Sequence, residues 1–430
     1  MEIYVVQKGD TIEAIAEKYG VPLERLIEDN GLPNPFNLVV GQSIVIVYPE
    51  QQYMVQEGDT IESISNANQI SVRQLYRNNI FLTDRDYIYP GETLVIRYGG
   101  KRGSITTNGY ANPFISQDVL KRTLPYLTYL TIFGYRFTEE GEVIAPEDEV
   151  MIQMAKDYGV APIMLLSSLT LQGVGNYDVS YNIIYSKQKT DSLIENIITL
   201  LRAKGLYGVN FIYTFLTAER EDAYNRFTES LSERLGQEGF KLIISIPPLM
   251  MIEGSTITFE RIDYTRIGQL ADQVIVMEYN WGYNFNPPVP AASLNTLQTF
   301  LNYISVFIPK EKLIIGLPLI GYVWQLPYFI GVTKANSIST EDAIILAMDT
   351  GSEISFDEVS QTPYFAFTTE PEGVPKNYIV WFVDARSIAA LLDLVEEYKA
   401  PGIAIWNIMS YFQQMWLIIN TQFEIETLPT

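Results

Sequence analysis

The sequence predicts an α/β protein in which a (β/α)8 TIM barrel with an α+β insertion follows two small βααβ modules. Two observations predict this architecture. The N-terminal segment repeats one pattern twice, which indicates tandem copies of a single supersecondary unit. Beyond the repeats, apolar strand-like runs alternate with amphipathic helical patterns, and this alternation is typical of a parallel sheet covered by helices.

The repeats define the first two modules. The stretch that starts at Tyr4, YVVQKGDTIEAIAEKYGVPLERLIEDNGL, is echoed from Tyr53 by YMVQEGDTIESISNANQISVRQLYRNNIF. Each copy closes with a short strand after a glycine turn, at 39–48 and at 89–98. The pattern therefore predicts a strand, a Gly-Asp-Thr turn, two helices and a final strand.

In both copies an aspartate stands where the first helix should begin. The carboxylates of Asp10 and Asp59 could accept hydrogen bonds from the unpaired amides of the first helical turn, so we predict that they are N-caps. Isoleucines at helical spacing follow, beginning at Ile12 and Ile61, and they predict the buried face of that helix.

The rest of the chain reads as a linker and a barrel. Eight apolar runs predict the barrel strands, at residues 104–110, 127–133, 160–166, 207–213, 240–247, 273–279, 312–318 and 402–406. The helical pattern TDSLIENIITLLRAK lies between two of these runs and ends at Gly205, a regular helix stop. The predicted domains are a first module (1–49), a second module (50–98), a glycine-rich linker (99–103) and the barrel (104–430), with an insertion at about 321–382.

Composition excludes several kinds of chemistry. The chain has 29 basic and 51 acidic residues and a net charge of −22, which disfavours nucleic acid and membrane surfaces as partners. Cys and His are absent, so thiolate nucleophiles, Ser–His or Cys–His dyads and His-ligated zinc are excluded. The acids are scattered, and we expect neither a metal nor another cofactor. Acid–base chemistry must come from Asp, Glu, Tyr or Lys.

Aromatic residues gather where the barrel strands end. Barrel enzymes carry their chemistry at the carboxyl ends of the strands. Stacking on aromatic rings suits the apolar faces of pyranose sugars, because it desolvates both partners without needing charge. The alternative is that single rings simply pack in the barrel core. The aromatic residues at these ends are Tyr110, Phe133, Tyr213, Tyr279, Trp281, Trp324 and Trp406.

The two repeats resemble the LysM module, through the GDT-I-x-x-I start, the Asn near the end of the second helix and the G-Q/E-x-I/L-x-I finish. The resemblance implies binding of N-acetylglucosamine chains of peptidoglycan or chitin, between the Gly-Asp-Thr loop and the loop after the second helix. The alternative is that the Asp and Thr only cap a helix, and both readings can hold. The marked positions are Gly9, Asp10, Thr11, Ile12 and Asn30, then Gly58, Asp59, Thr60, Ile61 and Asn79.

The barrel region resembles family 18 glycoside hydrolases, specifically the branch that follows two LysM modules in bacterial spore cortex-lytic enzymes. The resemblance rests on stretches such as TTNGY, VIVMEYNWGY and GIAIWNIMSYFQQMW. It implies cleavage of N-acetylglucosamine linkages by substrate-assisted catalysis. In that mechanism a Glu protonates the glycosidic oxygen while the acetamido oxygen of the sugar attacks, oriented by an Asp and a Tyr. It also implies that Tyr279 orients the sugar and that Trp406 forms the floor of the sugar pocket. With the strand-end aromatics Tyr110, Phe133 and Trp281, they form the predicted substrate-binding set of the barrel.

The fourth barrel strand departs from that family. The family signature is Asp-Gly-x-x-x-Asp-x-Glu, whereas this chain reads YGVNFIYT from Tyr207. Ile212 replaces the orienting Asp, and Thr214 replaces the proton donor. A threonine hydroxyl is far too weak an acid, and general acid–base catalysis typically contributes about 10²–10⁴-fold. We therefore predict a barrel without catalytic residues and a chain that is not an enzyme.

Another carboxylate would have to replace the lost proton donor. Glu219 lies in TAEREDAY, which reads as the acidic first turn of the next helix. Glu278 alternates with Met277 and Tyr279, so it should point away from the lumen if those two point inward. An active N-acetylglucosaminidase that uses a relocated acid stays as an alternative.

The main functional prediction is a glycan-binding protein of the spore envelope, with peptidoglycan as its partner and a catalytically silent barrel. A second hypothesis is a structural subunit of a spore surface layer or appendage, which contacts copies of itself or other spore-surface proteins. The start, MEIYVVQKGD, lacks a secretion signal, so we expect synthesis in the mother-cell cytoplasm. No run reaches the ~18–20 apolar residues of a membrane span.

Overall fold

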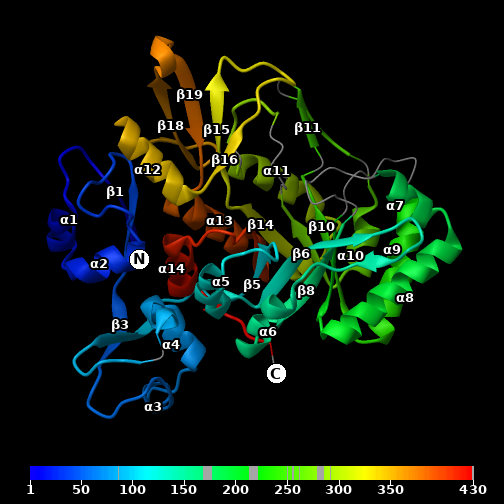
Figure 1. Cartoon of the computed structure of the whole chain (residues 1–430), viewed down its shortest axis with the longest axis horizontal. Helices are drawn as coiled ribbons and strands as arrows, with labels where there is room; N and C mark the ends of the chain where they lie inside the picture. Colours follow the sequence, from blue (N-terminus) through cyan, green and yellow to red (C-terminus); the bar gives the residue numbers. More distant parts are fainter. Residues whose placement is uncertain are drawn as a thin grey trace.

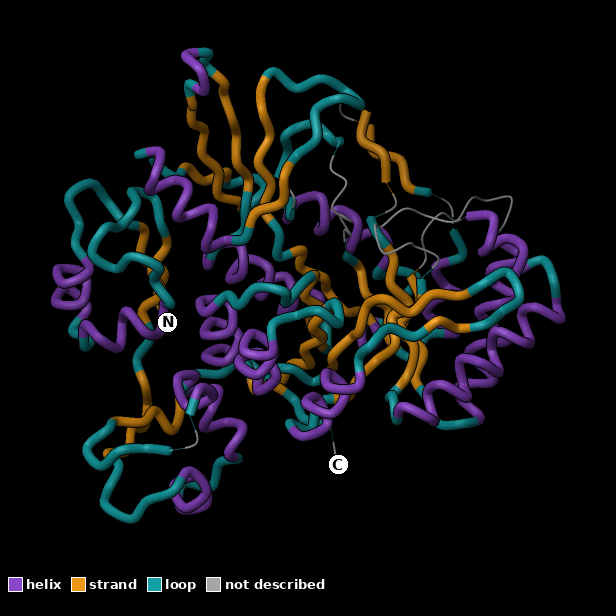
Figure 2. The backbone as a smooth tube through the Cα atoms, in the orientation of Figure 1, coloured by secondary structure: helices purple, strands orange, loops and turns teal. Residues whose placement is uncertain are grey.

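The computed structural model describes residues 1–85, 87–167, 177–212, 221–248, 250–253, 256–260, 262–277, 285–290 and 292–428. In Figure 1 the two N-terminal modules, in blue, lie beside the barrel, and the insertion projects from the barrel at the top of the view. Figure 2 shows helices on the outside of the barrel strands.

The first module has the predicted βααβ order. Its two strands pair antiparallel. The predicted core isoleucines Ile12 and Ile15 are 0% and 2% exposed, so the helical spacing identified the buried face correctly. The elements are β1 (Glu2–Val5), α1 (Ile12–Tyr19), α2 (Leu23–Asn30) and β2 (Ser43–Ile46).

The second module repeats this order with one addition. A short 3-10 helix follows its second helix and lengthens the turn before the last strand. Its two strands also pair antiparallel. The elements are β3 (Pro49–Met54), α3 (Ile61–Ala67), α4 (Val72–Asn78), η1 (Ile80–Asp84) and β4 (Thr93–Tyr98).

The prediction that Asp10 and Asp59 cap the first helices is wrong. The N-caps are the next residues, Thr11 and Thr60, and each hydroxyl accepts a hydrogen bond from the amide three residues further on. Each aspartate instead accepts hydrogen bonds inside the turn that precedes the helix. The Gly-Asp-Thr motif therefore supplies a closed turn and a cap from adjacent residues.

Eight parallel strands close into a barrel, as predicted. Each of the eight predicted apolar runs overlaps one of them, and β5 and β6 extend beyond the predicted ends. Consecutive barrel strands pair in parallel, and the last pairs with the first to close the sheet. The strands are β5 (Ser104–Ala111), β6 (Tyr129–Phe137), β8 (Ala161–Leu166), β9 (Gly208–Ile212), β10 (Lys241–Ile246), β13 (Gln273–Val276), β14 (Leu313–Pro318) and β20 (Gly402–Trp406).

Helices cover the outside of this barrel. The longest, α8, ends at Gly205, whose φ of 62° is the left-handed conformation predicted for the helix stop. The helices are α5 (Gln117–Thr123), η2 (Leu124–Tyr126), α6 (Glu149–Asp157), α7 (Tyr177–Ile184), α8 (Lys187–Lys204), α9 (Glu221–Gln237), α10 (Tyr264–Leu270), α11 (Leu294–Ile304), η4 (Lys310–Lys312), α13 (Ala385–Tyr398) and α14 (Gln413–Gln422).

An α+β insertion follows the seventh barrel strand. Its sheet has five strands, several of which are short. The sheet order is β16-β15-β19-β18-β17, and α12 packs on one of its faces. The elements are β15 (Gly321–Leu326), β16 (Asn336–Ile338), α12 (Thr340–Thr350), β17 (Ser355–Asp357), β18 (Thr362–Thr369), η5 (Pro371–Gly373) and β19 (Lys376–Trp381).

Short strands complete the described structure. A hairpin of β11 (Met250–Glu253) and β12 (Thr256–Phe259) follows β10, while β7 (Val143–Ile144) and β21 (Glu424–Ile425) extend the barrel sheet at its edges. Within the described ranges, no helix combines the length and the apolar character that crossing a membrane requires.

Helix α14 joins the barrel to both modules. It contacts α2 of the first module and α4 of the second. The modules are therefore packed against the barrel rather than connected to it by the linker alone.

Candidate functional site

One cluster of buried side chains fills the lumen of the barrel. Its members come from all eight barrel strands or their ends, so they converge on the barrel axis. They are Tyr110, Tyr129, Phe133, Ile163, Leu165, Ile212, Ile243, Ile275, Met277, Ile314, Ala404 and Trp406.

Three of the predicted sugar-binding aromatics meet in this lumen. The rings of Tyr110 and Trp406 lie edge to face with centroids 5.5 Å apart, and those of Phe133 and Trp406 lie 6.1 Å apart. The three residues are 0%, 5% and 6% exposed in the order Tyr110, Trp406, Phe133. As they stand, the rings pack against one another, so a sugar could stack on Trp406 only if these side chains part.

A neutral hydrogen-bond network lies beside these rings. The amide nitrogen of Asn210 donates to the Tyr110 hydroxyl over 3.0 Å, and the Ser245 hydroxyl donates to Asn210 Oδ1 over 3.0 Å. The Tyr110 and Ser245 hydroxyls are 3.2 Å apart. Asn210 and Ser245 are fully buried and hold Tyr110 in place. The sequence analysis missed both, although Asn210 and Ile212 share one face of β9 by strand alternation.

The positions of the family's acids are occupied by uncharged side chains. Ile212 is 3% exposed and packs in the lumen cluster. The ring of Tyr207 lies 5.8 Å from that of Tyr129 at the edge of the same cluster. Burial raises the pKa of Tyr129 to about 12, so its hydroxyl stays protonated at neutral pH. The described lumen therefore offers hydrogen bonds but no carboxylate.

Several predicted residues lie outside the part of the chain that the structure describes. They are Tyr213, Thr214, Glu219, Glu278, Tyr279 and Trp281. Trp324 is described, but it lies on β15 of the insertion rather than at the end of a barrel strand. It is fully buried and donates from Nε1 to the carbonyl of Asn286 over 3.0 Å. Its predicted place at the barrel mouth is wrong, because β14 ends at Pro318.

The Gly-Asp-Thr turn of the first module is closed by its aspartate. Gly9 adopts a φ of 92°, which an L side chain rarely tolerates. The Asp10 carboxylate accepts hydrogen bonds from the Tyr4 hydroxyl over 2.6 Å and from the backbone N–H of Gln7 over 2.8 Å. The hydrogen bond from Tyr4, followed by that from Gln7, lowers the pKa of Asp10. Thr11 follows as the exposed N-cap.

The second module reproduces the same turn. Gly58 has a φ of 89°, and Asp59 accepts hydrogen bonds from the Tyr53 hydroxyl over 2.9 Å and from Gln56 N–H over 2.7 Å. Ile61, like Ile12 in the first module, lies in the module core and is 5% exposed. The two turns thus present backbone and threonine groups to solvent, while the isoleucines support them from below.

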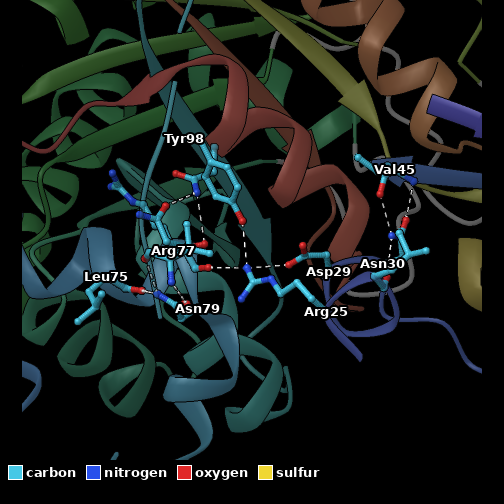
Figure 3. A network of polar contacts seen from close by, with 12 residues as sticks. Arg25, Asp29, Asn30, Val45, Leu75, Arg77, Asn79 and Tyr98 are labelled. Atoms are coloured by element: carbon cyan, nitrogen blue, oxygen red, sulfur yellow. Dashed lines mark hydrogen bonds and ion pairs between the residues drawn. The ribbon is translucent and has the colours of Figure 1, made fainter. Parts of the chain in front are cut away.

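The two asparagines of the LysM resemblance are buried, at 4% exposure for Asn30 and 0% for Asn79. Asn30 Nδ2 donates to the carbonyls of Leu26 and Val45, and its Oδ1 accepts from Val45 N–H. Asn79 makes the same three bonds with Leu75 and Val95, and Figure 3 shows both residues. Their amides therefore tie the second helix to the last strand and are not presented to a glycan.

A bound metal ion needs a cluster of ligand side chains. Across the described ranges, no three or more Asp and Glu side chains gather closely enough to hold a metal ion.

The fold is a closed (β/α)8 barrel with an α+β insertion, preceded by two βααβ modules. The model of glycosyl hydrolases family 18 matches residues 169–410, and the LysM domain model matches residues 4–47 and 53–97. The chain belongs to glycosyl hydrolases family 18 and carries two LysM domains.

Its relatives match it from end to end. The chain is 30% identical to the "Cortical fragment-lytic enzyme" of Bacillus subtilis (strain 168), over 99% of both chains. It is 29% identical to the protein of the same name from Bacillus cereus, again over 99% of both. The crystal structure of the Bacillus megaterium QM B1551 spore cortex-lytic enzyme SleL superposes with a TM-score of 0.80 at 30% identity, covering 99% of each chain.

These relatives overturn the prediction of a catalytically silent barrel and of a chain that is not an enzyme. Proteins similar over their whole length carry the names of lytic enzymes, which points to an active glycosidase. The comparisons give no support to a structural spore-surface protein either. Reasoning from Ile212 and Thr214 failed because it treated the loss of a local motif as the loss of activity.

Proposed function

We propose that this chain is a glycoside hydrolase that cleaves N-acetylglucosamine-containing glycan of the bacterial spore cortex. The similarity to cortical fragment-lytic enzymes over 99% of the chain carries this proposal. The LysM modules hold the glycan while the barrel cuts it. The proton donor is a carboxylate outside the positions of Tyr207, Ile212 and Thr214.

The neutral lumen constrains how such an enzyme works. Asn210, Ser245 and Tyr110 are fully buried and hydrogen-bonded to one another, and none of them protonates a leaving oxygen at neutral pH. The acid therefore comes from a segment that follows a barrel strand in the sequence. Glu219 follows β9 and Glu278 follows β13, which makes them the first candidates.

The same relatives support a proposal for the partner and the location. We propose that the chain is associated with the spore and acts on cortex peptidoglycan, after synthesis in the mother cell. The net charge of −22 favours a glycan substrate over polyanions. Contacts with other spore-surface proteins are not needed for this function.

Hydrolysis of purified cortex fragments by the full-length chain tests the proposal. Mass spectrometry should detect new reducing ends at N-acetylglucosamine. If Glu219 is the acid, E219Q lowers the rate by about 10²-fold or more, whereas the neighbouring E221Q leaves it unchanged. The same comparison applies to E278Q. Absence of product from the native chain over long incubation would overturn the proposal.

A further inference from the structure

A groove runs along the seam between the first module, the insertion and the barrel. It encloses about 440 Å³, within the range of about 300–1,000 Å³ that ligand pockets occupy. It is lined by the end of α2 with the residues after it, by α5, by the start of α12, and by the loop after β20 with the start of α14. The lining residues that matter below are Pro33, Thr340, Ser410, Tyr411, Phe412 and Gln414.

The walls of this groove are fixed by direct contacts. Gln414 Nε2 donates to Asn30 Oδ1 over 2.9 Å and to the Ser43 carbonyl over 2.8 Å, which joins α14 to the first module. On the insertion side, Ile354 N–H donates to the Val40 carbonyl over 2.9 Å. The groove is therefore a preformed feature, and a ligand that enters it pays little ordering entropy.

The lining suits a neutral, hydrogen-bonding ligand. Its lining includes the polar residues Ser410 and Gln413 and the aromatic residues Tyr411 and Phe412. Gln414 is 3% exposed, and its Oε1 accepts no hydrogen bond from the described residues. That atom is closed to the groove, so a ligand there would meet exposed groups such as the Ser410 hydroxyl.

The charged residues of the groove do not change this preference. The Arg122 guanidinium makes a two-pronged contact with Asp84 at 3.0 and 2.6 Å, so its charge is already paired. Glu341 stands on the opposite wall, where burial raises its pKa. An anionic ligand would find no unpaired cation here, whereas a sugar would meet amides, hydroxyls and rings.

The groove also lies between the loop after α2 of the first module and the segment that follows β20 of the barrel. One end is formed by the residues after Asn30, which open the loop that the LysM resemblance assigns to glycan binding. The other end is formed by Met409 to Gln414, a few residues after Trp406 at the end of the eighth barrel strand. We propose that this groove is an additional subsite for an N-acetylglucosamine-containing saccharide, which continues a glycan from the first module toward the barrel. This inference rests on the proposed function.

Filling the groove tests the inference. A thio-linked chito-octaose, which resists hydrolysis, and a chitobiose are titrated into the full-length chain by calorimetry. S410W should weaken octasaccharide binding by about tenfold and leave disaccharide binding at the modules unchanged. P33W, which fills the groove from the opposite wall, should act in the same way. S337W, on the exposed strand β16, is the matched control and should bind as the native chain does.

The outcomes separate this inference from the proposed function. If S410W, P33W, S337W and the native chain bind the octasaccharide with equal affinity, the groove is not a saccharide subsite, whatever the chain hydrolyses. Weakened octasaccharide binding in a chain that releases no product from cortex fragments would overturn the proposed function and leave the subsite standing. Unchanged melting temperatures of both filled variants show that a lost affinity is not a folding defect.

Discussion

The two LysM modules share a fold and a turn but are attached to the barrel by different chemistry. In the first module the loop before β2 packs against the insertion. Val39 lies in the apolar core of the insertion, and the Gly41 carbonyl accepts a hydrogen bond from Arg386 over 3.1 Å. This attachment depends on close backbone approach and apolar burial.

The second module is attached by buried arginines. Arg73 donates to the carbonyls of Pro125, Leu127 and Tyr158, and Arg77 donates to those of Pro125 and Ile425. Among the described residues, neither forms an ion pair with a carboxylate. Burial lowers the pKa of Arg73 to about 9 and that of Arg77 to about 10, so both stay charged at neutral pH.

A polar link between the modules completes the arrangement. Figure 3 shows the Arg25 guanidinium between Asp29 of its own helix, at 2.8 Å, and the Tyr98 hydroxyl of the second module, at 3.0 Å. The two copies therefore share a fold, while the residues on their outer surfaces attach them to the barrel in different ways.

The largest difference is expected at a glycine that both modules share. A Cβ on Gly41 would overlap the carbonyl oxygen of Ile354, whereas one on Gly91 would meet no heavy atom within 4 Å. Both glycines have left-handed φ angles, 87° and 91°. G41A should therefore lower the free energy of unfolding by about 3–5 kcal/mol, and G91A by about 1–2 kcal/mol. Urea denaturation of both variants measures this, and equal losses would contradict the account.

The buried asparagines give the next comparison. N79A leaves three backbone groups without their partner, which should lower the free energy of unfolding by about 2–3 kcal/mol. N30A leaves the equivalent three and also removes an acceptor of Gln414, so we expect a further loss of about 1 kcal/mol. Thermal melts of the two variants check the order. Stability unchanged in both, with glycan binding lost, would instead assign the amides to the ligand.

Weakening the arginine contacts of the second module should cost less free energy, and the change should be confined to that module. R73K keeps the charge but loses the planar fork, so it should cost about 2 kcal/mol of docking free energy. Hydrogen exchange should then speed up in α4 and η2, while α1 stays protected. R97K, an exposed change in the same module, serves as the control. Uniform exchange across both modules would contradict separate attachment.

The sequence predicts those features of the structure that a local pattern determines, and it does not predict those that depend on a tertiary contact. The eight barrel strands follow from apolar runs, and the α8 stop at Gly205 follows from the left-handed φ that glycine allows. The predicted N-cap was wrong because both Asp and Thr can cap helices. Asp10 is instead held by a hydrogen bond from the Tyr4 hydroxyl, which leaves Thr11 as the cap. Such a contact is invisible in the local pattern.

The site was harder to predict than the fold. Tyr110, Phe133 and Trp406 were expected together at the barrel and do meet there, because strand ends converge in a closed sheet. The burial of Asn30 and Asn79 depends on the packing of a helix against a strand, which spacing does not reveal. Activity was misjudged for another reason: a motif on one strand does not exclude a carboxylate brought in from elsewhere.

The smallest expected effect concerns pH. The lowered pKa of Asp10 means that its carboxylate stabilises the first module above its ordinary pKa of about 3.9. That contribution is lost as the pH falls through the lowered value. D10N should therefore melt slightly below the native chain at neutral pH and converge with it in strong acid. A constant difference at all pH values would contradict this assignment.

The most direct test of the central claim is the release of product from cortex fragments by the native chain, followed by mass spectrometry beside the double variant I212D/T214E. The account predicts that the native chain releases fragments ending in N-acetylglucosamine and that the double variant is not needed for activity. Product from the double variant alone would contradict it.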